Sequence, residues 1–284
     1  IIFETAVFTN ISLDHLDSFK TMENYINAKK TLFTPEMCKT AAVNADDNVG
    51  KMLISNPLVH TVSYGIENDA DIYAENVDIS GKLSFSLNIN GKIPLNTRLY
   101  GKFNLYNSLA AAAACVCLDI ETKHIVKGIE KMNAVLGRFN VIECGKFKFI
   151  IDYAHTPDGI QNVLSSARQI CGGRLICVFG CGGNRDKSKR QIMGSVASEL
   201  ADFCVITSDN PRFEDPMQII KEIEKGVSGK NYIIIENRKK AISYAAFSAK
   251  EGDIIAVLGK GGEQYQEISG IRYPYSGFDA VNNI

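Results

Sequence analysis

The sequence predicts an α/β protein of about two domains, the second of which is built on a mostly parallel sheet. The chain has 284 residues, of which 45% are hydrophobic and 22% are charged, so it is long enough to bury two cores. In its second half, apolar strand patterns alternate regularly with helical patterns. This alternation is typical of parallel strands joined by helices that cover both faces of a sheet.

The first half has a more mixed pattern. An apolar run ending at residues 7–10 predicts a buried strand with a polar tip at 14–17, and a helix is predicted over 21–33, beginning at Thr21. A short strand and a turn follow at 43–47. A hairpin turn at Asn90 and Gly91 lies among four predicted strands, at residues 61–64, 72–79, 83–89 and 92–99. Residues 101–107 lead into a helix predicted at 109–117.

The second half predicts five strands and four helices in alternation. We place the domain boundary near residues 137–142 and divide the chain into domains 1–139 and 140–284. The strands are predicted at residues 147–152, 174–180, 203–207, 231–235 and 253–258, and the helices at 158–170, 189–201, 216–225 and 238–249.

Four of these strands run into polar tips that contain glycine or proline. Because the carboxyl ends of parallel strands meet at one edge of a sheet, we expect the four tips to form one composite site. Their charged residues suit a charged and zwitterionic ligand. The tips are residues 152–157, 180–186, 208–212 and 259–263.

Composition excludes several classes of partner. The formal net charge is -1, so there is no electrostatic footprint for nucleic acid or an anionic membrane. No apolar run approaches the roughly 20 residues of a membrane span, and no targeting signal is recognised. The eight cysteines have no metal-binding or disulfide spacing and are expected to be reduced. The reduced cysteines indicate a cytoplasmic protein. We also expect it to be a monomer.

Taken one at a time, the candidate residues have ordinary alternatives. His15 reads as a polar loop residue and Lys29 as a solvated helix lysine, since an ammonium cannot ligate magnesium unless CO₂ carbamylates it. Asn104 could cap a helix, Arg138 could form a surface ion pair, and Asp152 could cap a turn. The glycines of residues 180–186 lack the spacing of a phosphate-binding loop.

Taken together, the motifs closely resemble the Mur ligase family, whose members use ATP to add amino acids to the peptidoglycan precursor. The resemblance covers nearly the whole chain. It implies the later part of a central ATPase domain followed by a Rossmann-like amino-acid-binding domain. The matching segments are residues 7–17, 21–25, 28–33, 44–47 and 101–111, Gly137-Arg138-Phe139 and residues 152–158.

The resemblance also implies roles for individual residues. His15 would bind Mg²⁺, and Lys29 would hold the same ion as a carbamate. An asparagine amide would read the adenine of ATP, with Asn107 favoured over Asn104, because an amide offers both a donor and an acceptor. Arg138 would contact ATP, and Asp152 would face the nucleotide from the second domain. His155, in the same stretch as Asp152, is assigned to substrate binding.

The segment Asp209-Asn210-Pro211-Arg212 resembles the signature of family members that add meso-diaminopimelate to UDP-N-acetylmuramoyl-L-alanyl-D-glutamate. Diaminopimelate carries an ammonium and a carboxylate at its far end. Arginine suits the carboxylate, and an acidic side chain suits the ammonium. Arg212 and Arg185 would bind the carboxylate and Glu263 the ammonium, whereas lysine would leave these arginines unused. The remaining substrate contacts are assigned to Asp209, Asn210 and the Gly259 backbone, with Lys189 and Arg190 helping to bind nearby anions.

The chain also departs from the family pattern. It begins at Ile1 in an apolar run and lacks the ATP phosphate loop, a magnesium-sharing glutamate and the UDP-binding domain. We therefore expect a segment of a longer protein that is inactive alone. Gly262 stands where histidine is usual. A sister ligase, such as a folylpolyglutamate-type enzyme, and a non-catalytic truncated remnant remain open alternatives.

Overall fold

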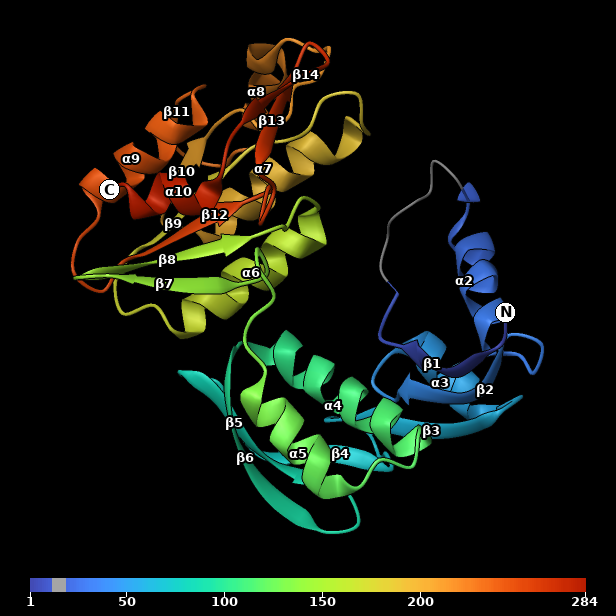
Figure 1. Cartoon of the computed structure of the whole chain (residues 1–284). Helices are drawn as coiled ribbons and strands as arrows, with labels where there is room; N and C mark the ends of the chain where they lie inside the picture. The colour runs from blue at the N-terminus through green and yellow to red at the C-terminus, as the bar shows by residue number, and fades with distance from the viewer. Residues whose placement is uncertain (12–18) are drawn as a thin grey trace. The chain divides into compact units, whose positions relative to one another are not determined.

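The computed structural model describes residues 1–11 and 19–284 and has an α/β fold, which confirms the predicted class (Figure 1). The described chain forms two compact units, Ile1–Asn133 and Ala134–Ile284. We predicted the division after residue 139, which lies just inside the second unit. Each unit is described by itself below.

The first unit is built on a six-stranded mixed sheet. Its first four strands are parallel, and the last two pair antiparallel. The predicted hairpin joins the last two strands, with Asn90 and Gly91 at positive φ values of 50° and 137°. The strands lie in chain order: β1 (Phe3–Phe8), β2 (Cys38–Asn44), β3 (His60–Gly65), β4 (Ile72–Asp78), β5 (Lys82–Asn88) and β6 (Lys92–Tyr100).

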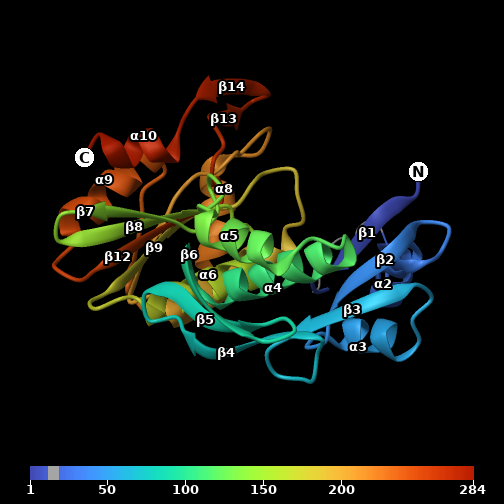
Figure 2. The same cartoon turned by 60° about the horizontal axis from the view of Figure 1, so that its bottom comes forward.

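Helices cover both faces of this sheet. Helices α4 (Lys102–Cys117) and α5 (Thr122–Lys131) bury one face, while α3 (Asn48–Ser55) and the 3-10 turn η1 (Thr31–Phe33) bury the other (Figure 2). The helix predicted over 21–33 divides into α2 (Met22–Lys30) and η1. The helix predicted at 109–117 begins earlier, at Lys102, because Gly101 with φ 83° ends β6 and turns the chain directly into α4.

The second unit has a six-stranded sheet in the order β11-β10-β9-β12-β8-β7, parallel except for β7. Five strands lie within a residue or two of their predicted bounds, and β7 was not predicted. The strands are β7 (Asn140–Cys144), β8 (Phe147–Asp152), β9 (Leu175–Phe179), β10 (Phe203–Ile206), β11 (Tyr232–Ile234) and β12 (Ile254–Leu258).

Alternate side chains of these strands point to two layers of helices. Phe149, Ile176 and Val257 belong to the core formed with α9 (Arg238–Ser248) and α10 (Gly277–Asn282). Helices α6 (Pro157–Gln169), α7 (Ser188–Leu200) and α8 (Pro216–Glu224) pack in sequence on the other face. A small hairpin, β13 (Tyr265–Ile268) and β14 (Ile271–Pro274), follows β12. The strand order makes β10, β9, β12 and β8 neighbours, so their carboxyl ends lie side by side.

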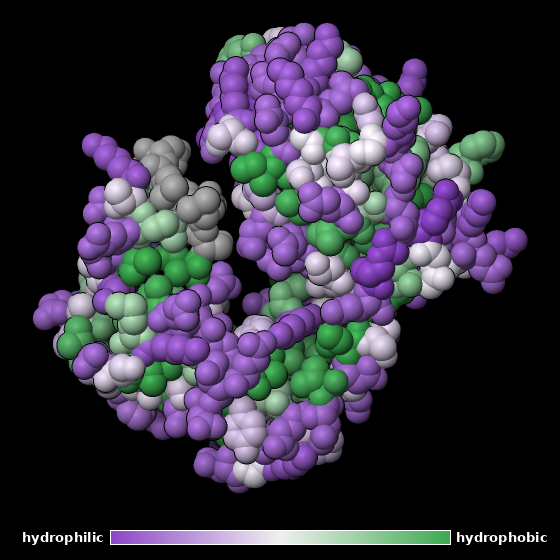
Figure 3. Space-filling model, turned by 180° about the vertical axis from the view of Figure 1, so that it is seen from behind, coloured by the Kyte–Doolittle hydropathy of each residue, from purple (hydrophilic) through white to green (hydrophobic). Residues whose placement is uncertain are grey.

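Hydrophilic residues separate the exposed hydrophobic ones into small patches on the face shown in Figure 3. Among the described residues, no helix has both the length and the apolar character needed to cross a membrane.

Candidate active site

The four predicted tips follow four neighbouring strands of the second unit. They come after β8, β9, β10 and β12, at the carboxyl edge of the parallel sheet. Ligands bind at this edge in open α/β sheets. The structure therefore brings together the tip residues that the sequence singled out.

Asn210, Lys260 and Glu263 form the centre of this edge. The Lys260 ammonium donates to Asn210 Oδ1 at 2.8 Å and to Glu263 Oε2 at 2.7 Å, and Asn210 Nδ2 donates to the same Oε2 at 3.0 Å. Glu267 N donates to Asn210 Oδ1 at 2.9 Å. Two donors therefore fix the amide oxygen of Asn210, and among residues 1–11 and 19–284 no hydrogen bond to Glu263 Oε1 is found, which leaves this oxygen for an external donor.

Sequence reasoning missed Lys260. Its side chain is only 2% exposed, and its ammonium also lies 5.5 Å and 5.6 Å from the ring centroids of Tyr265 and Tyr275. A buried cation must be paired, and the Lys260 ammonium contacts the Asn210 amide oxygen, the Glu263 carboxylate and both rings. The one sequence signal was its place between two glycines directly after a buried strand.

Arg212 links the tips after β9 and β10. Its Nη1 donates to Gly183 O at 2.7 Å, and its Nε lies 3.5 Å from Glu267 Oε2. The side chain is half-buried, and φ at Arg212 is 52°, a conformation that costs free energy in a non-glycine residue. Within the described part of the chain we find no partner for Nη2. Arg185, at the tip after β9, is exposed.

Asp209 and Gly259 pack against each other at the carboxyl edge of the sheet. Asp209 Oδ1 accepts the Asn210 N–H at 2.7 Å, and Oδ2 lies 3.8 Å from Nη1 of the buried Arg238. A Cβ at Gly259 would lie 2.7 Å from that Oδ2, and φ there is 109°, so only glycine fits without strain. Asp209 Oδ2 is buried and has no hydrogen bond within the described residues.

Asp152 joins the tip after β8 to the start of the unit. Its two carboxylate oxygens accept the N–H groups of Phe139 and Ala154, each at 2.7 Å. Burial raises the pKa of Asp152 above its ordinary value, although these hydrogen bonds and the charge of Arg138 oppose the rise. Asp152 thus ties the backbone at Phe139 to the tip after β8.

The exposed side chains near this tip stack on Tyr153. The Arg138 guanidinium carbon lies 4.8 Å from the Tyr153 ring centroid, and the His155 ring packs edge-on at 4.9 Å. His155 Nδ1 lies 3.0 Å from Tyr153 O. The structure therefore brings Arg138 and His155 together with Asp152 in one unit.

The asparagines of the first unit lie on the first turns of α4. Asn104 Nδ2 donates to Tyr100 O at 2.9 Å, and the exposed Asn107 donates from Nδ2 to Asn104 Oδ1 at 3.2 Å. Asn104 is therefore held by the backbone, and Asn107 is the better placed of the two to meet a ligand.

An acidic pair, Asp46 and Asp47, follows β2. Asp46 accepts hydrogen bonds from Ile66 N at 2.6 Å, Asn68 N at 2.9 Å and Tyr106 Oη at 2.8 Å. Burial disfavours the Asp46 charge, but these hydrogen bonds together lower its pKa below the ordinary value. Asp47 caps α3 by accepting the Val49 N–H at 2.7 Å. Both carboxylates are thus engaged with the protein itself.

The structure describes one of the two predicted metal ligands. His15 lies outside the described residues. Lys29 is exposed on α2, with its Nζ 5.4 Å from the Tyr25 ring centroid. Among residues 1–11 and 19–284, no three His, Cys, Asp or Glu side chains are grouped so that they could hold a metal.

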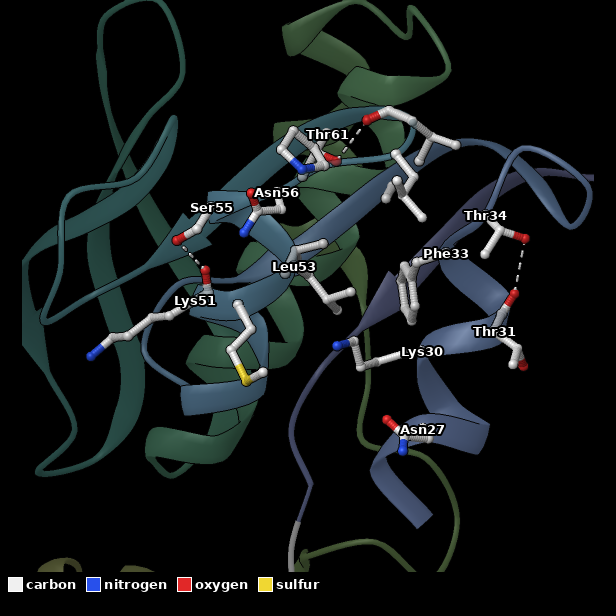
Figure 4. Close-up of a pocket in the computed structure, with 16 residues that line it drawn as sticks. Asn27, Lys30, Thr31, Phe33, Thr34, Lys51, Leu53, Ser55, Asn56 and Thr61 are labelled. Atoms are coloured by element: carbon white, nitrogen blue, oxygen red, sulfur yellow. Dashed lines mark hydrogen bonds between the residues drawn. The ribbon is translucent and has the colours of Figure 1, made fainter. Parts of the chain in front are cut away.

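A pocket of about 560 Å³ lies elsewhere in the first unit, between α2 with η1 and α3. Figure 4 shows Phe33 and Leu53 on its two sides, with Lys30 between α2 and the strands. None of the predicted site residues lines it. It is therefore not the site that the motifs indicate.

Comparison with known proteins relates both units to one family. A model of the Mur ligase middle domain matches residues 1–115, and a model of the Mur ligase glutamate ligase domain matches residues 137–261. The UDP-N-acetylmuramoyl-L-alanyl-D-glutamate–2,6-diaminopimelate ligase of Aquifex aeolicus (strain VF5) is 45% identical over 284 residues, which are 99% of this chain and 58% of the relative. The chain thus spans a little over half the length of such relatives.

Solved structures agree with this grouping. A structure of a UDP-N-acetylmuramoyl-L-alanyl-D-glutamate–2,6-diaminopimelate ligase is 35% identical with a TM-score of 0.65, over 99% of this chain and 59% of that one. Folylpolyglutamate synthase of Mycobacterium tuberculosis shares the fold at 18% identity, with a TM-score of 0.73 over 90% of this chain and 61% of that one. The family models and these relatives together show that the chain belongs to the Mur ligase family, with segments that match its middle domain and its glutamate ligase domain.

Proposed function

We propose that the full-length protein uses ATP to join meso-diaminopimelate to UDP-N-acetylmuramoyl-L-alanyl-D-glutamate. The observation that carries the proposal is the carboxyl edge of the second unit, where the Arg212 guanidinium and the Glu263 carboxylate are held by one hydrogen-bond network. The names of relatives at 43–45% identity support the same substrates.

The edge matches the far end of diaminopimelate in charge. Nη2 of Arg212, with the exposed Arg185, would take the distal carboxylate. Glu263 Oε1 would accept from the ammonium, since Oε2 is already occupied by Lys260 and Asn210. We assign Asp209, the Gly259 backbone and His155 to the same substrate. Lysine has no distal carboxylate and would leave the two arginines without a ligand.

Arg190 does not join this set, contrary to the expectation that it helps to bind nearby anions. Its side chain is 0% exposed, and its guanidinium is already bound by Glu214 and Glu222. A ligand could reach it only by displacing both carboxylates.

For the nucleotide we propose Asn107 at the adenine, with Asn104 holding it in place, and Arg138 and Asp152 from the second unit. Asn107 is exposed and keeps an amide oxygen for a purine amine. Asp152 acts by fixing the backbone next to Arg138 and Tyr153, because both of its oxygens already accept N–H groups.

For magnesium we propose His15 and Lys29. Lys29 fits only as a carbamate, since its exposed ammonium is a cation. A bound Mg²⁺ would neutralise negative charge on the phosphates of ATP.

The reaction follows from these assignments. An oxygen of the D-glutamate side-chain carboxylate attacks the γ-phosphorus of ATP, so ADP leaves and an acyl phosphate forms. The diaminopimelate amine nitrogen then attacks the acyl carbon, phosphate leaves, and the nitrogen loses its extra proton as the amide forms. The network at Asn210 and Glu263 would hold the far end of diaminopimelate and so orient the reacting amine at its other end, and such orientation removes much of the entropic barrier of a two-substrate reaction.

We also propose that the protein acts in the cytoplasm as a monomer without nucleic-acid or membrane partners. All eight cysteines are free thiols, which suits a reducing compartment. The net charge of -1 supports the absence of a nucleic-acid partner.

The test is an assay of the full-length protein with ATP, MgCl₂ and the UDP-dipeptide, offering either meso-diaminopimelate or L-lysine. Release of ADP and the mass of the UDP-linked product are measured. We expect efficient product formation with diaminopimelate and a much lower kcat/KM with lysine. Equal use of lysine would show that the diaminopimelate assignment is wrong. If neither amino acid gave ADP release and a UDP-linked product, the ligase proposal would be overturned.

A further inference from the structure

Glu214 lies two residues after Arg212 and forms a two-pronged ion pair with Arg190. Its Oε1 and Oε2 accept from Arg190 Nη2 and Nη1, each at 3.0 Å. Lys187 Nζ lies 3.3 Å from Oε2. Paired N–H···O bonds of this kind fix geometry as well as adding energy. The Glu214 carboxylate is therefore held in one orientation.

The same two residues hold the loop that carries Arg185. Glu214 Oε1 accepts the backbone N–H of Asn184, and Arg190 Nη2 donates to Gly182 O at 3.3 Å. The pair thus binds the loop on both sides of Gly183, immediately before Arg185. Phe213 N donates in turn to Asn184 Oδ1 at 3.1 Å.

Gly183 itself is bound from the Arg212 side. Its N–H donates to Asn210 O at 2.9 Å, and its carbonyl accepts Arg212 Nη1 at 2.7 Å. A Cβ at Gly183 would lie 1.9 Å from Pro211 O, so the two tips pack backbone against backbone. The loop before Arg185 and the segment around Arg212 are therefore one hydrogen-bonded unit.

We propose that Glu214, held by Arg190, is a positioning residue that sets Arg185 and Arg212 at the separation needed to grip one carboxylate of the amino acid. This inference rests on the proposed function. A purely structural ion pair would tie α7 to α8, and Arg190 has a separate partner for that purpose. Its Nη1 donates to Glu222 Oε2 on α8 at 2.7 Å. Glu222 touches the same guanidinium, and no hydrogen bond joins it to residues 182–185.

Hydrogen bonds from Arg190, opposed by burial, lower the pKa of Glu214 to about 2. The carboxylate is therefore ionised at every pH at which an enzyme assay is practical, and the loop contacts stay in place.

The matched variants are Glu214→Gln and Glu222→Gln in the full-length enzyme. Each removes one carboxylate from Arg190, but only Glu214→Gln disturbs the loop. We expect Glu214→Gln to raise the KM for meso-diaminopimelate by about 10- to 100-fold, the range that a misplacement of roughly 1 Å can produce. The KM for ATP should stay within about twofold in both variants, as should the KM for diaminopimelate in Glu222→Gln. Equal effects of the two variants on diaminopimelate would overturn the inference.

A double-mutant cycle tests the route of the effect. In an Arg185→Ala background, Glu214→Gln should raise the KM for diaminopimelate by much less than it does alone, because the side chain that it positions is gone. Full additivity of the two substitutions would contradict positioning through Arg185.

Amide hydrogen exchange separates this inference from the proposed function. Exchange at residues 183–185 should be faster in Glu214→Gln than in the wild type and unchanged in Glu222→Gln. If the wild-type enzyme did not use diaminopimelate, the proposed function would fail whatever the exchange result. If exchange at the loop were unchanged in Glu214→Gln, the positioning role would fail whatever the substrate.

Discussion

The two units use their polar residues differently at the strand ends. In the second unit, Asn210 and Glu263, which are proposed to bind the amino acid, are hydrogen-bonded to the buried Lys260. In the first unit, the polar network belongs to the half-buried Asp46, while the proposed ligand-binding residues Asn107 and Lys29 are exposed. Binding and stability should therefore depend on the same residues in the second unit and on different residues in the first.

The largest effect is expected for Arg212→Ala in the full-length enzyme. Truncating one partner of a desolvated charge pair costs about 2–5 kcal/mol, or roughly 30- to several-thousand-fold in affinity. The KM for meso-diaminopimelate should rise by that factor, while the KM for ATP and any weak use of L-lysine change little. Steady-state kinetics with each substrate varied in turn measures this.

Arg168→Ala is the matched control for Arg212→Ala. Arg168 pairs with Asp202 at 2.8 Å. Asp202 directly precedes β10, so this ion pair lies at the amino ends of the strands, opposite the carboxyl edge. It should leave all KM values unchanged. A uniform loss of affinity for ATP and both amino acids in Arg212→Ala would make Arg212 a purely structural residue.

Lys260→Met should weaken stability and binding together. It leaves the Glu263 carboxylate and Asn210 Oδ1 without their shared donor. Breaking a buried pair costs about 3–5 kcal/mol, and we expect about 3 kcal/mol because the Glu263 side chain is 22% exposed. Urea unfolding gives the free energy, and kinetics should show a raised KM for diaminopimelate.

Two further variants sharpen the Lys260 result. Adding Glu263→Gln to Lys260→Met should restore part of the lost stability, because the unpaired charge is removed. Arg174→Met breaks the ion pair with the buried Asp253 and should lower stability without changing any KM. A Lys260→Met protein as stable as the wild type would show that the network around Lys260 does not stabilise the fold.

Asp46→Asn should lower stability in a way that depends on pH. The hydrogen bonds that lower the pKa of Asp46 in the folded state stabilise its ionised form. This contribution is complete above the unfolded pKa of about 3.9 and is lost as the pH falls through the lower folded value. We expect a loss of about 2 kcal/mol at neutral pH, typical of hydrogen bonds to a charged group, and a smaller loss in acid. Urea unfolding across this pH range tests the sign, and a pH-independent loss would contradict it.

The smallest effect is expected for Asn107→Ala. Loss of one net hydrogen bond, about 1 kcal/mol, should raise the KM for ATP by about fivefold. The melting temperature should not change, since Asn107 is exposed. Asn104→Ala should instead lower stability, because Asn104 binds the Tyr100 carbonyl. If Asn104→Ala raised the KM for ATP and Asn107→Ala lowered stability instead, Asn104 would be the residue that contacts the adenine.

The fold of the second unit was predictable because four of its strands end in glycine- or proline-containing tips that mark their boundaries. The first unit was less so. Helix α4 begins without a side-chain cap at Gly101, so no serine, threonine or aspartate announced its start. Helix α3 has only eight residues, and its one strong signal, the Asp47 cap, reads equally well as a turn.

The members of the site were easier to predict than their contacts. The tips identified Arg212, Asn210 and Glu263 as candidates. The surroundings of Lys260 depend on Tyr265 and Tyr275, which lie at the two ends of the later hairpin β13–β14. Arg190 looked available to a ligand because its two acidic partners lie more than twenty residues further along the chain. Tertiary pairing of this kind leaves no local pattern.

The place of β12 in the second sheet has a consequence for how the chain folds. It lies between β8 and β9 and is the last of the six strands in sequence. Until residues 254–258 leave the ribosome, β7 and β8 cannot be joined to β9, β10 and β11, and each part keeps an open strand edge. Long-range pairing of this kind is slow, and open edges invite association with other chains. Completion of the sheet also brings Lys260 and Glu263 to Asn210, so the candidate site can form only after β12 has joined the sheet.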